Sequence, residues 1–309
     1  MEHFCTLFDS NFLPQGLSLY RSLEKHAGDF HLWILCMDKQ VEEQLKTLQL
    51  KNVSMLSLHE IENQELLRVK ASRSAVEYFW TLSPFLPNFI LNHSPELKRI
   101  TYLDADLFFF DSPEKLLQEL DQSGKQALIT EHAYAPEYNQ TEKSGRFCVQ
   151  FVSFTNTEKA KNILKWWQDR CIEWCFARHE DGKFGDQKYL DQWPSLFPDA
   201  VCVLENKTLT LAPWNVKFYL QQSPGLKPVF FHFHGLRIYP SSIRLFSGYS
   251  IGKRAEKFYQ IYVNELKESM AGMAKNCLKL SVMQPNYTFL DKLRILKRTL
   301  LGREKFLPL

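Results

Sequence analysis

Residues 100–110 read Ile-Thr-Tyr-Leu-Asp-Ala-Asp-Leu-Phe-Phe-Phe and place two carboxylates inside an otherwise apolar run. The stretch predicts a buried strand over residues 99–103 that runs into Asp104-Ala105-Asp106. Because alternate residues of an extended chain point to the same side, we expect the two carboxylates to project together. The alternative is a solvated turn with two surface acids, which the large apolar residues on both sides disfavour.

The Asp104–Asp106 pair indicates a metal site. Two like charges a few ångströms apart repel when they are buried, and a divalent cation between them removes that cost. Ligands that are all oxygen select Mg²⁺ or Mn²⁺ over zinc. In an open α/β sheet, ligands bind at the carboxyl ends of the strands, which is where we expect this pair to lie.

The chain before this strand alternates strands with helices. Such alternation predicts an α/β fold with a mostly parallel central sheet and helices on both faces. The expected strands are residues 4–8, 30–36 and 53–58, and the expected helices are residues 13–26 and 39–48.

The remaining elements are predicted from prolines and caps. Residues 74–91 predict a helix that is interrupted by Pro84 and Pro87, since each proline removes a helix hydrogen bond. Thr155 and Glu158 resemble a capping box that opens a further helix. The other expected elements are a helix that begins at Ser112-Pro113-Glu114, strands at residues 126–130 and 147–154, and a polar binding or gating loop at residues 131–145.

The composition is that of a globular protein with a sizeable core. Of 309 residues, 45% are hydrophobic and 24% are charged, which allows one large α/β domain or two small ones. The net charge is +3, and residues 291–309 alone hold six basic and two acidic residues. The body of the chain is therefore close to neutral, and we expect no nucleic-acid partner.

The cysteines and the apolar segments predict the compartment. The seven cysteines are scattered without a C-x-x-C pair, which favours reduced, buried thiols over a disulfide framework. The N-terminus has no basic start followed by an apolar core, and the chain has no run of about 18 apolar residues. We expect a cytoplasmic protein.

Residues 230–235 carry two histidines in a strand-like pattern. Alternation would place His232 and His234 on one face and Phe231 and Phe233 on the other. An imidazole beside two carboxylates gives a mixed ligand set that suits Mn²⁺. The alternative is a pair of hydrogen-bonded core histidines.

Two shorter motifs are weaker by themselves. Asp186, in Gly185-Asp186-Gln187, could contact a ligand or could simply cap the helix that follows. Trp214 and Asn215 form an exposed-looking pair of the kind that packs a sugar ring and hydrogen-bonds its hydroxyls.

The order of these motifs resembles that of glycosyltransferase family 8 and its bacterial relatives near surface-polysaccharide genes. The resemblance implies an A-type glycosyltransferase fold, a UDP-sugar donor, and Mn²⁺ or Mg²⁺ as the cofactor. It spans about residues 4–240 and rests on Tyr102-Leu103-Asp104-Ala105-Asp106, Gly185-Asp186-Gln187, Trp214-Asn215 and His232-Phe233-x-Gly235.

The same resemblance assigns roles to residues. It implies that Asp104, Asp106 and His232 are the metal ligands, with Asp106 the closer of the two carboxylates. It places Asp186 and Gln187 beside the reacting carbon of the donor sugar as catalytic residues. The implied donor-binding set is Phe8, Asp9 and Asn11 at the base and ribose, together with Asp104, Trp214, Asn215 and His234.

The sequence departs from the family pattern at three places. Cys148-Val149-Gln150 stands where the family has Asn-x-Gly, which puts the polar contact of that asparagine in question. Arg73 lies too far upstream to replace the basic residue that the family has before its D-x-D motif. Residues 236–240 replace the family's Lys-Pro-Trp, so Arg237 is expected to face the phosphates as a third catalytic residue.

These features predict a metal-dependent glycosyltransferase. We expect it to move a hexose-type sugar from a UDP-sugar to a glycan or lipid-linked acceptor in surface polysaccharide or lipopolysaccharide synthesis, and the resemblance implies retention at the anomeric carbon. The alternative is a catalytically silent nucleotide-sugar or glycan-binding module of the same fold, which Cys148-Val149-Gln150 would favour. Haloacid-type phosphatases also use D-x-D, but Leu107-Phe108 does not fit the residues that follow it there.

The C-terminal part predicts a separate element. We expect a transferase domain at residues 1–270 and a helical, basic, amphipathic tail at residues 271–309. A helix of this kind could lie on an anionic membrane surface, with contact through residues 286–309 at the inner face, or it could dock on the domain. The apolar residues at helical spacing are Phe289, Leu290, Leu293, Leu296 and Leu300.

Overall fold

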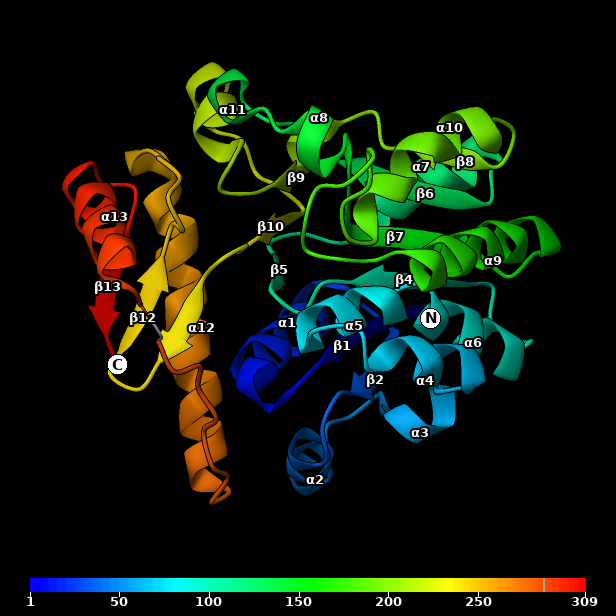
Figure 1. Cartoon of the computed structure of the whole chain (residues 1–309), viewed down its shortest axis with the longest axis horizontal. Helices are drawn as coiled ribbons and strands as arrows, with labels where there is room; N and C mark the ends of the chain where they lie inside the picture. The colour runs from blue at the N-terminus through cyan, green and yellow to red at the C-terminus, as the bar shows by residue number, and fades with distance from the viewer. Residues whose placement is uncertain (286) are drawn as a thin grey trace.

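A seven-stranded sheet forms the centre of the molecule in the computed structural model, which describes residues 1–285 and 287–309 (Figure 1). Its strand order is β3-β2-β1-β4-β7-β6-β8, and β7 alone runs antiparallel to both of its neighbours. The predicted mostly parallel sheet is thus confirmed. The strands are β1 (Glu2–Phe8), β2 (Phe30–Cys36), β3 (Val53–Ser57), β4 (Arg99–Leu103), β6 (Ala127–Glu131), β7 (Phe147–Thr155) and β8 (Val201–Val203).

Helices cover both faces of this sheet, as the alternation predicts. In β1, Phe4 and Phe8 pack on one face while Cys5 and Leu7 pack on the other, because successive side chains of a strand point to opposite sides. The first face is covered by α1 (Leu13–His26), α2 (Lys39–Leu48) and α7 (Glu114–Ser123), and the second by α3 (Leu58–Ile61), α4 (Gln64–Lys70), α5 (Ala75–Leu82), α6 (Phe85–His93) and α9 (Glu158–Glu173).

Two local predictions change in detail. The interrupted helix at residues 74–91 is two helices that meet at Ser83-Pro84, and Pro87 lies in the first turn of the second, where its missing N–H costs nothing. The capping-box prediction for Thr155 is wrong. The hydroxyl of Thr155 instead donates to the side chain of Gln126, and Thr157 caps α9 by accepting from the N–H of Ala160.

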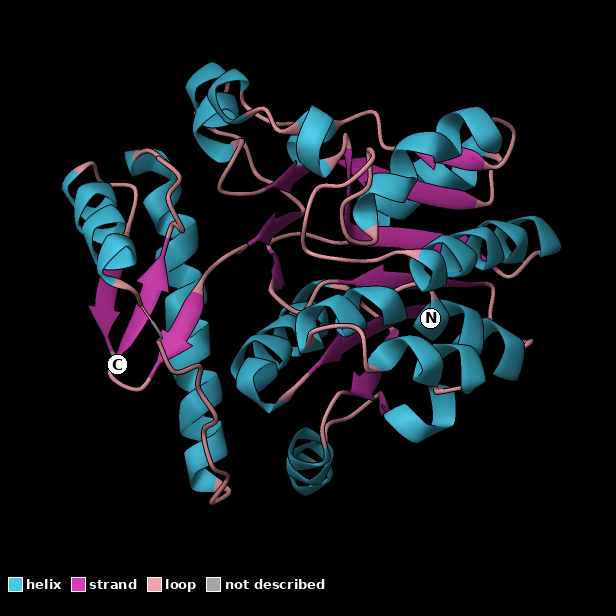
Figure 2. Cartoon of the chain, in the orientation of Figure 1, coloured by secondary structure: helices cyan, strands magenta, loops and turns pink. Residues whose placement is uncertain are grey.

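Two small sheets lie beside the central one (Figure 2). One joins β5 (Leu107–Phe109), β10 (Phe230–His232) and β9 (Thr210–Leu211), and the other joins β11 (Arg237–Tyr239), β12 (Ser242–Leu245) and β13 (Lys305–Pro308). The second sheet gathers with α12 (Glu256–Lys275) and α13 (Phe289–Leu300) at the left of Figure 1. The remaining helices are α8 (Thr141–Ser144), α10 (Trp193–Leu196) and α11 (Val216–Gln222), with 3₁₀ turns at Ser10–Phe12, Pro136–Tyr138, Gln187–Gln192, Lys207–Leu209 and Lys253–Ala255.

The C-terminal residues are built into this layer. Helix α12 runs continuously through the predicted domain boundary at residue 270, and β13 pairs with β12. The fully buried carboxylate of Glu304 forms an ion pair with Arg244 on β12. The segment 271–309 is therefore not a helical tail alone, because its last strand is bonded to the part of the chain before residue 270. Within the described residues, no helix combines the length and the apolar character needed to cross a bilayer.

The first strand and first helix approach closely at Gly16. A Cβ atom built on Gly16 would lie 2.5 Å from ring atoms of Phe8, which is buried and cannot swing away. We therefore expect Gly16→Ala to lower the free energy of unfolding by about 1–2 kcal/mol, since the overpacking exceeds the gain in helix propensity. Chemical denaturation measures this change. Gly225→Ala is the control, since nothing lies within 4 Å of its Cβ position, and equal losses in the two variants would contradict the prediction.

Candidate active site

A cavity of about 520 Å³ opens at the carboxyl ends of β1 and β4. It lies where the fold class predicts a ligand site, at the strand ends of an open sheet. Its walls contain all the predicted site residues except Asn215: Phe8, Asp9, Asn11, Asp104, Asp106, Asp186, Gln187, Trp214, His232, His234 and Arg237.

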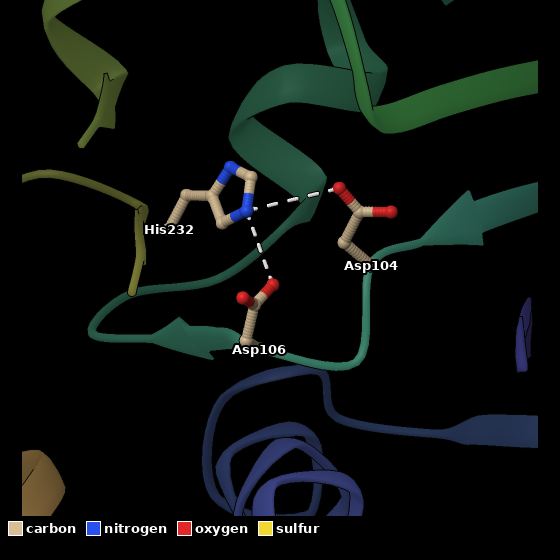
Figure 3. Close-up of side chains that lie close together, drawn as sticks. All are labelled: Asp104, Asp106 and His232. Atoms are coloured by element: carbon tan, nitrogen blue, oxygen red, sulfur yellow. Dashed lines mark ion pairs between the residues drawn. The ribbon is translucent and has the colours of Figure 1, made fainter. Parts of the chain in front are cut away.

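Asp104, Asp106 and His232 converge within this cavity (Figure 3). The Nε2 atom of His232 lies 3.0 Å from Oδ1 of Asp106 and 3.8 Å from Oδ2 of Asp104. One ligand atom from each residue lies within 4.8 Å of the other two. Both carboxylates face His232, as predicted, and Asp106 is the closer to the imidazole. The reason differs from the expected extended spacing, because residues 104–106 form a turn in which the N–H of Leu107 donates to the carbonyl of Asp104 at 3.2 Å.

Backbone hydrogen bonds fix this geometry. In the antiparallel β5–β10 pair, His232 is opposite Leu107, the residue that follows Asp106. The N–H of Phe233 donates to the carbonyl of Asp106 at 2.9 Å, and the N–H of Asp104 donates to the carbonyl of Gln150 at 3.0 Å. Three segments that are far apart in the sequence are thus held together at the site.

The charges of Asp104, Asp106 and His232 influence one another's pKa values. Burial raises the pKa of Asp104 to about 6, with attraction to His232 opposing the change and repulsion from Asp106 adding to it. Burial has the same effect on Asp106, but attraction and hydrogen bonding to His232 lower its pKa to about 2. Burial lowers the pKa of His232, and the interactions with Asp106 outweigh it, so the pKa lies well above its usual value. The carboxylates therefore need positive charge beside them.

Gln150 orients the histidine of the cluster. Its amide Nε2 donates to the hydroxyl of Thr130, which leaves Oε1 facing Nδ1 of His232 at 2.8 Å. The Nδ1 atom must then carry a hydrogen, so Nε2 is the nitrogen that faces the two carboxylates and that would hold a metal ion in place of its proton. A residue that departs from the family pattern thus supplies the support that metal-bound histidines usually have.

The turn after β1 forms a rigid wall of the cavity. The carboxylate of Asp9 accepts from the N–H and side-chain amide of Asn11 and from the N–H of Phe12. Beyond it, the N–H and hydroxyl of Ser10 both donate to Asp38, each at 2.9 Å. The predicted base-facing residues are held in place before any ligand arrives.

Asp186 and Gln187 also line the cavity. Asp186 is buried, which raises its pKa to about 7, and its side chain makes no capping bond to the 3₁₀ turn that follows. The alternative reading of Asp186 as a helix cap therefore fails. The amide of Gln187 donates to the carbonyl of Ser144 at 2.7 Å and so ties the long loop at residues 131–145 to the site.

The Trp214–Asn215 pair is not exposed, contrary to the sequence prediction. Both side chains are buried, and the indole of Trp214 and the amide of Asn215 donate to the carbonyl of His132. Asn215 also accepts from the N–H of Ala212, so its polar atoms are engaged by the backbone. Trp214 still lines the cavity, with its ring centroid 5.5 Å from that of His232.

Arg237, which was predicted for the site, and Arg73, which was not, lie in different places. Arg237 lines the cavity with its guanidinium 5.2 Å from the ring centroid of Phe12. Arg73 lies elsewhere and donates to the carbonyls of Cys171 and Ile172 at the end of α9. This agrees with its exclusion from the site on sequence grounds. His234 follows β10 and faces the cavity as an exposed side chain.

Several residues in the cavity wall were missed by sequence reasoning. Most are aromatic or apolar and come from helix α5, the loop at residues 131–145 and the C-terminal layer, so no single motif contains them. They include Phe79, Trp80, Tyr134, Phe184, Tyr249 and Met283. Gln150 is not among these wall residues but supports His232. The sequence did point to it, because it lies in a stretch that departs from the family pattern.

The donor set fits a divalent cation. Two carboxylates and a neutral imidazole with its second nitrogen already bonded are suitable ligands for Mn²⁺ or Mg²⁺. The charge imbalance described above supports the same conclusion, since a cation would stabilise both ionised carboxylates.

Solved glycosyltransferases share this architecture. The galactosyltransferase LgtC, in complex with donor and acceptor sugar analogs, superposes with a TM-score of 0.57 at 13% identity, covering 86% of this chain and 95% of LgtC. The apo form of the glycosyltransferase GlyE from Streptococcus pneumoniae TIGR4 gives a TM-score of 0.53 at 16% identity, covering 93% of this chain and 66% of GlyE. These likenesses identify an A-type glycosyltransferase fold.

The chain belongs to glycosyl transferase family 8, whose family model matches residues 3–223. The uncharacterized protein YfnF of Bacillus subtilis (strain 168) is 32% identical over 250 residues, which cover 76% of this chain and 82% of YfnF. YfnD of the same strain, also uncharacterized, is 29% identical over 249 residues, covering 76% of this chain and 78% of YfnD. The protein is a glycosyltransferase.

The role of Gln150 is testable through metal affinity. Gln150→Leu removes the acceptor for Nδ1–H of His232, and we expect it to weaken Mn²⁺ binding about 10- to 100-fold. Titration calorimetry of the purified chain measures the dissociation constant. Ser153→Ala on the same strand is the control, because it removes a buried hydrogen bond to Thr101 away from the metal cluster. Unchanged affinity in Gln150→Leu would contradict the assignment.

Proposed function

We propose that this glycosyltransferase moves a hexose from a UDP-sugar to a glycan or lipid-linked acceptor, with retention at the anomeric carbon, in surface polysaccharide or lipopolysaccharide synthesis. The observation that carries the proposal is the Asp104–Asp106–His232 cluster in a cavity with room for a nucleotide-sugar. LgtC, which has the same fold and was solved in complex with donor and acceptor sugar analogs, supports a sugar donor for this chain.

The residues around the cluster suit a diphosphate leaving group. When bound by Asp104, Asp106 and His232, a divalent cation supplies Lewis-acid stabilisation of the departing nucleoside diphosphate. Arg237 adds a fixed positive charge to the same cavity, where negative charge grows as the bond to the sugar breaks. The turn at Asp9 and Asn11 offers its preorganised polar groups to the base and ribose.

Other residues of the cavity wall suit the sugar. Asp186 and Gln187 line the cavity, and the raised pKa of Asp186 lets its carboxyl group donate a hydrogen bond near neutral pH. Trp80, Phe184 and Tyr134 add aromatic surface of the kind that packs against sugar rings.

The alternative is a binding module of the same fold that has lost activity. Its main indication in the sequence is Cys148-Val149-Gln150. The hydrogen bond from His232 to Gln150 weakens that reading, because it preserves the metal cluster. Incubation with a panel of UDP-sugars and Mn²⁺ decides between the two. Release of UDP supports the enzyme, and binding of a UDP-sugar without UDP release supports the module.

The metal cluster is expected to control turnover. Asp106→Asn removes one of two carboxylate ligands, and we expect UDP release to slow by about 10²-fold or more, equivalent to about 3 kcal/mol of transition-state stabilisation. Asp111→Asn is the matched control, since Asp111 follows β5 on the same segment but pairs with Lys115 outside the cavity. Equal activity of Asp106→Asn and the wild type would remove the metal site from the mechanism.

The C-terminal helix supports a peripheral membrane location. We propose that the protein works in the cytoplasm at the inner face of a membrane and that α13 contacts anionic lipid. Phe289, Leu293 and Leu296 are 74%, 47% and 56% exposed on this helix, and basic residues accompany them. Residue 286, at the start of the predicted contact segment, lies outside the described residues. Docking of this face on the domain, the other reading, is disfavoured by its exposure in the described part of the chain.

Membrane contact is testable with vesicles. Leu293→Ser combined with Leu296→Ser removes part of the apolar face, and we expect binding to phosphatidylglycerol vesicles to weaken about 30-fold or more, as each of the two buried side chains contributes about 1 kcal/mol or more. The rate of UDP release, measured in solution without an acceptor, is the folding control and should not change. Leu196→Ser, an exposed leucine on α10, is the matched variant. Identical sedimentation of all three proteins would exclude lipid contact through α13.

A further inference from the structure

One segment of the chain crosses from the first half of the sheet to the C-terminal layer next to the cavity. Residues 278–285, here called the strap, follow α12 and precede α13. Leu278 and Leu280 pack against the apolar cluster under α1 and α2, while Val282 packs against the cluster of the C-terminal layer. Between these anchored parts and α13, Met283 contributes to the cavity wall.

Hydrogen bonds hold the strap on the α2 side. The side-chain amide of Gln44 donates to the carbonyl of Lys279 at 2.6 Å, and that of Gln40 donates to the hydroxyl of Ser281 at 2.7 Å. Gln40 lies two residues after Asp38, the same carboxylate that holds Ser10 in the turn after β1. This end of the strap is therefore tied to the part of the molecule that builds the Asp9–Asn11 wall.

A second contact holds the chain on the other side. The hydroxyl of Tyr287 donates to the hydroxyl of Tyr239 on β11 at 2.7 Å, and β11 begins with Arg237. Along the chain, Met283 therefore lies between two anchors. One is the pair of hydrogen bonds to α2, near the Asp9–Asn11 wall, and the other is the Tyr287–Tyr239 hydrogen bond on β11. The side chain of Met283 is 42% exposed and contributes to the cavity wall.

We propose that the strap forms the outer wall of the nucleotide end of the cavity and that Met283 packs on the base of the bound donor. The inference rests on the proposed nucleotide-sugar donor. A methionine thioether is polarizable and flexible, and it makes favourable contacts with flat aromatic rings. The occupant that suits it is a flat nucleobase between Met283 and the Asn11–Phe12 wall, with the diphosphate directed toward Arg237.

The arrangement makes a binding role more suitable for Met283 than a catalytic one. Its side chain has no ionisable proton and no charge. The Asp104–Asp106–His232 cluster already provides the site for the diphosphate. Contact with the base would contribute equally to the ground state and the transition state. A loss of this contact should then raise the KM for the donor and leave kcat unchanged.

Equilibrium binding to the full chain tests the proposal with two probes, UDP and inorganic pyrophosphate, each in the presence of Mn²⁺. Met283→Ala is expected to weaken UDP binding about fivefold and to leave pyrophosphate binding unchanged, because pyrophosphate has no base. Met283→Leu should restore most of the UDP affinity. Leu196→Ala, which removes an exposed leucine outside the cavity, is the control and should bind both probes as the wild type does.

A second variant tests the strap rather than the single side chain. Tyr287→Phe removes the hydroxyl that bonds Tyr239, and we expect it to weaken UDP but not pyrophosphate. Wild-type affinity for UDP in Met283→Ala, or an equal loss for UDP and pyrophosphate, overturns the proposal. If the wild type binds UDP but releases none from UDP-sugars, the proposed enzyme fails while the strap is still judged by UDP binding. A wild type that binds no nucleotide overturns both.

Discussion

The repulsion between Asp104 and Asp106 is the physical constraint that the rest of the site must offset. Both carboxylates lie at the carboxyl edge of the sheet, and His232 is 3.0 Å from one and 3.8 Å from the other. Such a cluster is stable only if the backbone prevents the two acids from turning apart and if positive charge is available beside them. Three separate segments meet that requirement, through hydrogen bonds from Asp104 to β7 and from Phe233 to Asp106.

The reversed strand β7 and the C-terminal layer follow from the same requirement. Strand β7 brings Gln150 under the cluster, where its amide fixes the hydrogen on Nδ1 of His232. The β5–β10 pair brings His232 beside Asp106, and the chain then continues into Arg237 and the small sheet that contains β13. The end of the chain therefore belongs to the structure of the site, since Met283 lines the cavity and Glu304 is buried against Arg244.

Local patterns predicted most of the sheet and the Asp104–Asp106 pair at the end of β4, and they failed where a distant partner changed the outcome. Thr155 has the spacing of a capping box, but its hydroxyl donates to the side chain of Gln126, which lies just before the neighbouring strand β6. Trp214 and Asn215 have the composition of an exposed sugar-binding pair, but the carbonyl of His132 engages both side chains in the interior. Cys148-Val149-Gln150 put a polar contact in question and favoured the alternative of a silent binding module, because the partner of Gln150, His232, is 82 residues away in the sequence.

The sequence by itself determined the alternation of strands and helices, the position of the Asp104–Asp106 pair at a strand end and the order of the motifs that define the family. These features depend on periodicity and on neighbouring residues, so they are present in the chain before it folds. Only the tertiary structure decided which histidine nitrogen faces the carboxylates, which predicted residues reach the cavity and how the C-terminal segment joins its wall. Those outcomes depend on hydrogen bonds and packing between residues distant in the chain, which form only when the sheet and its layers are assembled.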